Sequence, residues 1–145
     1  MPRHSASRVL LAPLEDVWAF LAEPFHLADW WPGIAGVQPD RRGLAPGARW
    51  RLQAGAQQSF GLALFRRPGA AGTLLVTEVE RGRRVAFHLA SEHTDAELEL
   101  ESEAPARTRV TLTVQGPWGA VSRSLPRRAL SRLFDLVQTS ADMRS

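Results

Sequence analysis

Hydrophobic residues near the N-terminus repeat with the spacing of a helix. One stripe of an amphipathic helix is formed by apolar residues at positions i, i+3, i+4 and i+7, namely Leu14, Val17, Trp18 and Leu21. We predict a helix over residues 14–23 that ends at Pro24, and we expect Trp18 to be almost fully buried because it completes this stripe. A strand over residues 5–11 precedes the helix, and a short helix over residues 25–31 follows it.

From Ile34 onward, apolar and polar residues alternate, which predicts antiparallel strands with one covered face and one solvated face. Strands are expected near residues 49–52, 75–79, 85–90, 96–101 and 109–114. We expect Leu75, Thr77 and Val79 to share one strand face. The glutamates at positions 97, 99 and 101 should face solvent beside a strand that carries Arg109 and threonines, because the alternating apolar positions must face the interior.

Two segments allow more than one interpretation. Residues 59–66 fit either a separate strand in an extra hairpin or the continuation of one long, bulged strand. The chain ends in a second amphipathic helix, whose stripe consists of Leu130, Leu133, Phe134 and Val137. Pro126 falls in the first turn of this helix if Ser124 is the N-cap, and it kinks the helix if the helix begins earlier, near Trp118.

Composition narrows the possible chemistry. The chain has 145 residues, of which 44% are hydrophobic and 23% charged, so we expect a single domain over residues 1–145. It contains no cysteine and no lysine or tyrosine, which excludes thiol nucleophiles, lysine Schiff bases and phenolic acids. No histidines have zinc spacing with a third ligand, so neither a metal nor a cofactor is predicted.

Charge and hydropathy bear on location and partners. The formal net charge is only +3, although the pI is about 11.1. The arginines occur in scattered pairs and do not gather in one block, so we expect no nucleic-acid partner. No apolar run approaches the roughly 18 residues of a membrane helix. We therefore expect a cytoplasmic protein without an integral membrane segment, either a monomer or a homodimer.

A set of short motifs runs through most of the chain in a characteristic order. They are VLLAPLEDVW at residues 9–18, ADWWPG at 28–33, Pro46-Gly47, VTEVE at 76–80, RRVAF at 83–87 and TRVTL at 108–112. Together they resemble the polyketide-cyclase branch of the START-like (SRPBCC) superfamily over about residues 7–137. The resemblance implies an α+β helix-grip fold. In that fold a curved antiparallel sheet of six to seven strands wraps a long C-terminal helix, and two short helices follow the first strand.

The resemblance also implies a cavity between the sheet and the last helix. Its candidate ligand-binding residues are Trp30, Trp50, Phe87, Leu89, Leu125, Ala129 and Leu133, although the same residues also fit an ordinary core. We expect Trp50, Phe87 and Leu89 to point inward from their strands. For Trp30 and its neighbour Trp31, a gate at the cavity mouth and a plug between helix and sheet fit equally well.

The leading functional hypothesis is a non-catalytic binder or carrier of a small apolar ligand of the lipid, polyketide, isoprenoid or quinone type, and no catalytic residue is predicted. An aromatase/cyclase-type enzyme is the alternative, with polar groups supplied by Arg49, Arg51, His26 or His88. His26 and Asp29 fit an acid–base pair or a surface helix contact, whereas strand parity predicts His88 on the outer face. A third possibility, a protein-interaction module, would require a large exposed apolar patch.

Overall fold

The computed structural model describes residues 2–54, 72–90, 93–117 and 123–144. Its elements follow one another as β1 (Arg3–Leu10), α1 (Leu14–Ala22), the 3-10 turn η1 (Pro24–His26), α2 (Leu27–Trp30), β2 (Ile34–Gln38), β3 (Arg49–Ala54), β4 (Gly72–Glu80), β5 (Arg84–Leu89), β6 (Thr94–Ala104), β7 (Arg107–Gln115) and α3 (Leu125–Arg144). The predicted helix over residues 25–31 is thus divided between η1 and α2. The possible strand over residues 59–66 lies outside the described residues.

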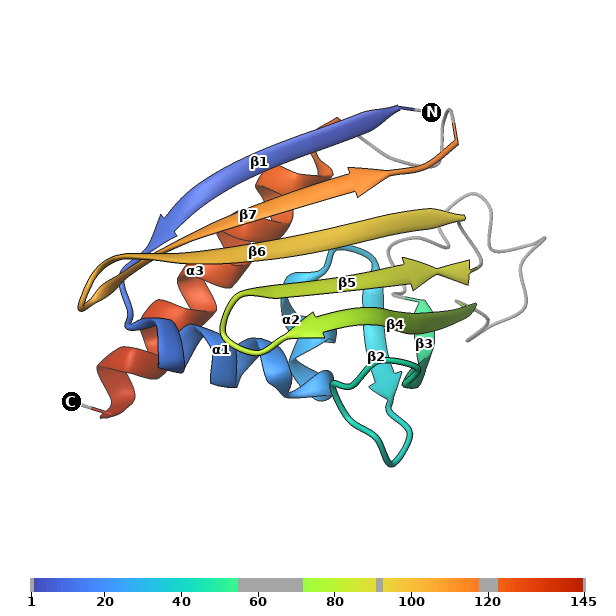
Figure 1. Ribbon diagram of the computed structural model, residues 1–145, viewed down its shortest axis with the longest axis horizontal. Coiled ribbons are helices and arrows are strands. Elements are labelled where there is room, and N and C mark those ends of the chain that lie inside the picture. The colour runs from blue at the N-terminus through green and yellow to red at the C-terminus, as the bar shows by residue number, and fades with distance from the viewer. Residues whose placement is uncertain (1, 55–71, 91–92, 118–122, 145) are drawn as a thin grey trace.

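All the strands form one antiparallel sheet in the order β1-β7-β6-β5-β4-β3-β2. Figure 1 shows the long helix α3 running diagonally behind β1, β7 and β6, while α1 and α2 lie beside it on the same side of the sheet. Each strand from β2 to β7 pairs with the next strand in the chain. The first strand, β1, pairs with β7 and forms one edge of the sheet. This arrangement confirms the predicted α+β helix-grip fold, with a curved sheet of seven strands.

The glutamate row lies on the solvent side of β6, as predicted. Ala96, Leu98 and Leu100 are buried, so the alternate positions of β6 face outward. Glu99 and Glu101 are exposed, and Glu97 is half-buried. The opposing residues on β7 are Thr113, Thr111 and Arg109, which is the expected pairing with threonines and an arginine.

The face predicted for β4 is wrong, because the strand contains a bulge. Val76 is buried, so its neighbours Leu75 and Thr77 turn toward the other face. The register then shifts between Val76 and Glu78, which leaves Thr77 and Glu78 exposed in succession and turns Val79 inward. A single inserted residue exchanges the two faces of every position that follows.

The prediction that Trp18 is almost fully buried is also wrong. The helix α1 packs on the sheet through Val17 and Leu21, both of which are buried, whereas Trp18 is only partly buried. Successive helical residues are about 100° apart around the axis. Val17 faces the sheet directly, so Trp18 lies at the edge of the buried stripe. It borders a groove of about 720 Å³ between α1 and the β4–β5 turn, whose other walls include Leu44 and Val79.

The last helix begins at Leu125, which places the buried Pro126 in its first turn. The backbone N–H of Arg128 donates to the carbonyl of Ser124 at 3.0 Å and closes this turn. The missing N–H of a proline is harmless in a first turn, so this start agrees with Ser124 as the N-cap. Trp118, the alternative start, lies outside the described residues. Among the helices described, none is both long enough and apolar enough to cross a bilayer.

Candidate ligand-binding site

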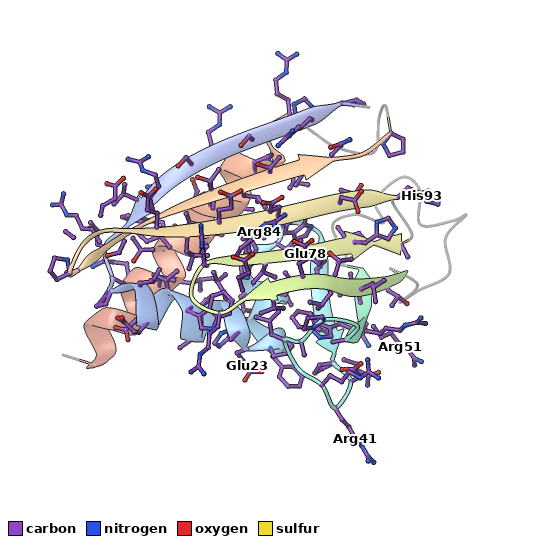
Figure 2. All side chains as sticks on the ribbon, viewed as in Figure 1. Glu23, Arg41, Arg51, Glu78, Arg84 and His93 are labelled. Carbon is purple, nitrogen blue, oxygen red and sulfur yellow. The ribbon has the colours of Figure 1, made fainter. Side chains whose placement is uncertain are left out.

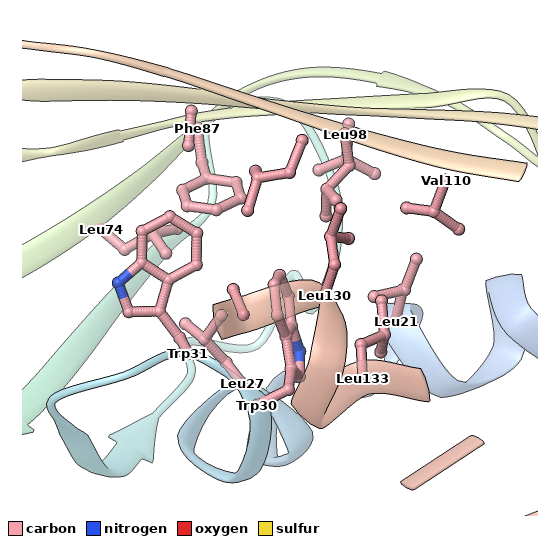
Figure 3. Close-up of a cluster of buried hydrophobic side chains, with 14 of the residues drawn as sticks. Leu21, Leu27, Trp30, Trp31, Leu74, Phe87, Leu98, Val110, Leu130 and Leu133 are labelled. Carbon is pink, nitrogen blue, oxygen red and sulfur yellow. The ribbon is translucent and has the colours of Figure 1, made fainter. Parts of the chain in front are cut away.

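The inner face of the sheet and the facing side of α3 form an apolar interior. Strand alternation turns one apolar side chain inward from every second position, as in Val85, Phe87 and Leu89 of β5. The helix contributes a buried stripe that consists of Ala129, Leu130, Leu133 and Val137. Side chains from the sheet, from α2 and from α3 belong to one continuous cluster (Figure 3).

Three aromatic rings lie in contact at one end of this interior. Trp31 meets Phe87 edge-to-face, with ring centroids 5.5 Å apart at 67°, and it meets Trp30 at 5.6 Å and 73°. Both tryptophans are 3% exposed. Figure 3 shows Trp31 directly below Phe87, so the end of α2 reaches the inner face of β5. Edge-to-face packing of aromatic rings is favourable, and these rings give this end of the interior a large apolar surface.

The predicted site residues all lie in or against this apolar cluster. Trp30, Trp50, Phe87, Leu89, Ala129 and Leu133 are buried members of the cluster, and Leu125 is partly buried against it. The inward direction predicted for the strand residues is confirmed. The polar end of the Trp50 ring is satisfied, since its Nε1 donates to the carbonyl of Gly43 at 2.9 Å. That these residues surround a bound ligand stays a prediction.

A family model for "polyketide cyclase / dehydrase and lipid transport" matches residues 1–138. The chain belongs to this family. The polyketide cyclase/dehydrase membership confirms the resemblance to the START-like superfamily that the motifs indicated. No curated protein matches the sequence.

Solved structures share the fold of this family member at low sequence identity. A Chromobacterium violaceum protein is 18% identical with a TM-score of 0.69, and the alignment covers 95% of this chain and 99% of that chain. A Nitrosomonas europaea protein is 18% identical with a TM-score of 0.67, covering 97% and 96%. An aromatase/cyclase from Streptomyces sp. R1128 is 16% identical with a TM-score of 0.66, covering 99% and 94%.

The polar side chains considered for a cyclase-type enzyme lie outside the apolar interior. Arg49 and Arg51 are exposed on the outer side of β3. His88 lies on the outer face of β5, as predicted, and its Nδ1 is 2.8 Å from Oδ1 of Asp95 on β6. None of these groups faces the cluster around Phe87.

The fourth candidate, His26, has a different partner from the one considered. Its ring stacks on Phe20 with centroids 4.0 Å apart, and its Nδ1 lies 2.8 Å from the carbonyl oxygen of Phe20. The contact therefore ties η1 to the end of α1, and it replaces the predicted contact with Asp29. A ring held in this way positions the turn after α1 and does not reach the interior.

Polar groups are scarce inside the described part of the chain. The buried polar side chains there are Thr94 and Thr108, and Oγ1 of Thr108 donates to the carbonyl of Ala12 at 2.9 Å. No three His, Asp or Glu side chains gather as metal ligands within the described ranges. The interior offers apolar contact, aromatic surface and little hydrogen bonding.

Some charged groups of the sheet form ion pairs on the opposite, outer face. Arg84 contacts Glu78 at 2.7 Å and Glu97 at 2.6 Å, and Figure 2 shows Arg84 and Glu78 on the face turned away from α3. The hydrogen bond from Arg84 lowers the pKa of Glu97. A hydrogen bond with Glu97 raises the pKa of Glu99. The ion-paired groups lie on the outer face, and the buried side chains of the described strands carry no charge.

Trp31 is the residue that the sequence-based site lacks. Its contact with Phe87 makes it the link between α2 and the sheet. The two adjacent tryptophans in ADWWPG were the sequence signal for this contact. The pattern of a short helix between two prolines does not show which of the two tryptophans points toward β5.

Proposed function

We propose that the protein binds or carries a small hydrophobic ligand of the lipid, polyketide, isoprenoid or quinone type between the sheet and α3. The ligand would contact Trp30, Trp50, Phe87, Leu89, Leu125, Ala129 and Leu133. The observation that carries the proposal is the apolar, aromatic interior around Trp31 and Phe87, from which the charged side chains of the described strands turn away. The family description, which includes lipid transport, supports the same function.

The aromatase/cyclase alternative has weaker support. Proton transfer to a bound substrate requires an acid or base within hydrogen-bond reach of it. The four candidate groups, Arg49, Arg51, His26 and His88, are on the outer surface or bonded to other groups. The similarity to the Streptomyces aromatase/cyclase concerns the fold, which hosts more than one function.

Ala129 provides the test, because it is fully buried and small where its neighbours on α3 are large. Ala129→Trp should fill a binding space and abolish saturable binding of N-phenyl-1-naphthylamine, an uncharged fluorescent probe. A pre-existing void accepts the new ring, so the free energy of unfolding should hardly change. If the position is close-packed, the same substitution should cost about 1–3 kcal/mol or more.

Ala106→Trp is the matched control, since Ala106 is exposed in the β6–β7 turn. It should leave probe binding and stability unchanged. Wild-type protein that binds no probe, together with an Ala129→Trp variant that melts much earlier, would contradict the proposal and favour an interaction module. If the wild-type protein does bind the probe, mass spectrometry of small molecules released from the purified protein would identify the ligand class.

A further inference from the structure

A second groove lies on the outer side of the sheet, where β2, β3 and β4 run side by side. Its volume is about 680 Å³, which is within the range of small-molecule sites. The strand register places Arg51 directly opposite Gln38 on β2 and opposite Thr73 on β4. One row of side chains therefore crosses three strands, and its guanidinium, carboxamide and hydroxyl groups are all hydrogen-bond donors.

The arginines of this groove differ from Arg84 and Arg109 on the same sheet. Arg84 and Arg109 form ion pairs with glutamates, whereas Arg49 and Arg51 contact no carboxylate within the described ranges. Residues 55–71, which join β3 to β4, contain no aspartate or glutamate, so that segment supplies no carboxylate either. No carboxylate of the described residues or of residues 55–71 therefore pairs with these two guanidinium groups, which lie two residues apart on one strand face and can bind an anion from outside.

Asp40 is the acidic residue that lines the groove, and its carboxylate has another role. Oδ1 accepts from the backbone N–H of Arg42 at 3.0 Å, and Oδ2 accepts from the backbone N–H of Arg49 at 2.8 Å. The bond from Arg49 is the main cause of the lowered pKa of Asp40. The carboxylate therefore fixes the β2–β3 loop against the start of β3, and the groove as a whole keeps a net positive charge.

An aromatic side chain completes the groove. Phe25, in η1, is 61% exposed and lines the same groove as the arginines. Only two large apolar side chains of the described residues are exposed, and Phe25 is more exposed than the other, Leu11, at 44%. Figure 2 shows Arg51 and Arg41 projecting from the same side of the molecule, away from the sheet.

We propose that this groove binds an organic anion whose phosphate or carboxylate contacts Arg49 and Arg51 and whose apolar part packs on Phe25. The site is separate from the interior, because the side chains of β3 that flank these arginines, Trp50 and Leu52, point to the opposite face. The same chemistry is offered by a free acidic metabolite and by the headgroup of an acidic lipid.

Calorimetric titration distinguishes these sources. One arm uses phenyl phosphate, and the other uses phosphatidylglycerol vesicles with phosphatidylcholine vesicles as the uncharged comparison. We expect saturable binding in at least one arm, and Arg51→Gln should weaken it about tenfold or more, since hydrogen bonds to charged groups are the strong ones. Phe25→Ala should weaken binding of phenyl phosphate and leave binding of inorganic phosphate unchanged.

Arg132→Gln is the matched control, because it removes the same charge from an exposed position on α3. It should retain wild-type affinity, and all variants should keep the wild-type melting temperature. Binding in the phenyl phosphate arm identifies a free anion, and binding confined to phosphatidylglycerol identifies a lipid surface. Absence of binding in both arms, equal losses in Arg51→Gln and Arg132→Gln, or a Phe25→Ala variant with unchanged affinity for phenyl phosphate would overturn the proposal.

Discussion

The buried hydroxyl of Thr108 allows a direct measurement of how β7 holds the connection into the first helix. Thr108 is 0% exposed, and its Oγ1 donates to the carbonyl of Ala12, itself 1% exposed, at 2.9 Å. Thr108→Val keeps the shape of the side chain and removes this donor. A buried carbonyl left without a partner costs about 1–3 kcal/mol, offset by about 0.8 kcal/mol for the added methyl group. We expect a net loss of up to about 2 kcal/mol.

Urea unfolding measures this loss as a lower midpoint with an unchanged slope. Thr113→Val is the matched control, because the hydroxyl of Thr113 lies on the outer face of the same strand, 3.1 Å from Oγ of Ser5. Water replaces that contact, so the control should stay within about 0.5 kcal/mol of wild type. Equal stability of Thr108→Val and Thr113→Val would refute the reasoning, since the carbonyl of Ala12 would then not depend on the hydroxyl.

Two further predictions concern the tryptophans near α1 and α2 and the neighbouring glutamates of β6. Trp31→Ala should cost about 3–5 kcal/mol, and the half-buried Trp18→Ala should cost less; thermal melts in which Trp18→Ala is the more damaging would contradict this. The stabilisation from the lowered pKa of Glu97 is present above its unfolded-state pKa and is lost as the pH falls through the folded value, so Glu97→Gln should destabilise at neutral pH. The contribution from the raised pKa of Glu99 is present at acid pH and is lost as the pH rises through the folded value. Glu99→Gln should therefore stabilise at neutral pH, and urea unfolding in which both variants shift the same way would speak against the shared hydrogen bond.

Periodicity predicted most of the fold because burial in this chain is one-sided. The strands β5, β6 and β7 alternate without interruption, so parity alone assigned Phe87 inward and Glu99 outward. The first predicted helix differs from α1 by one residue at its end, whereas the second is divided between η1 and α2. The motif order added the connectivity, which periodicity does not contain, and the family match over residues 1–138 agrees with it.

The errors have local causes that a periodic pattern does not record. The bulge in β4 between Val76 and Glu78 shifts the register by one residue, and no sequence signal marks it. Trp18 satisfies the spacing of the α1 stripe, yet which side of the stripe meets the sheet depends on the angle at which the helix packs. His26 contacts the backbone carbonyl and the aromatic ring of Phe20, and not the carboxylate of Asp29. This contact depends on how η1 folds back on α1, which the sequence pattern does not show.

The groove beside β2 was beyond prediction for a related reason, since it depends on which strands are neighbours. Parity predicted that Trp50 points inward, but only the register shows that Gln38 and Thr73 lie beside its neighbour Arg51. The same strand presents Trp50 to the interior, so β3 contributes to both proposed sites from opposite faces. A slip of one residue would exchange these faces and bury two unpaired guanidinium groups, which is strongly unfavourable. The charge that forms the outer groove thus also fixes the register that keeps the interior apolar, and each site supports the geometry of the other.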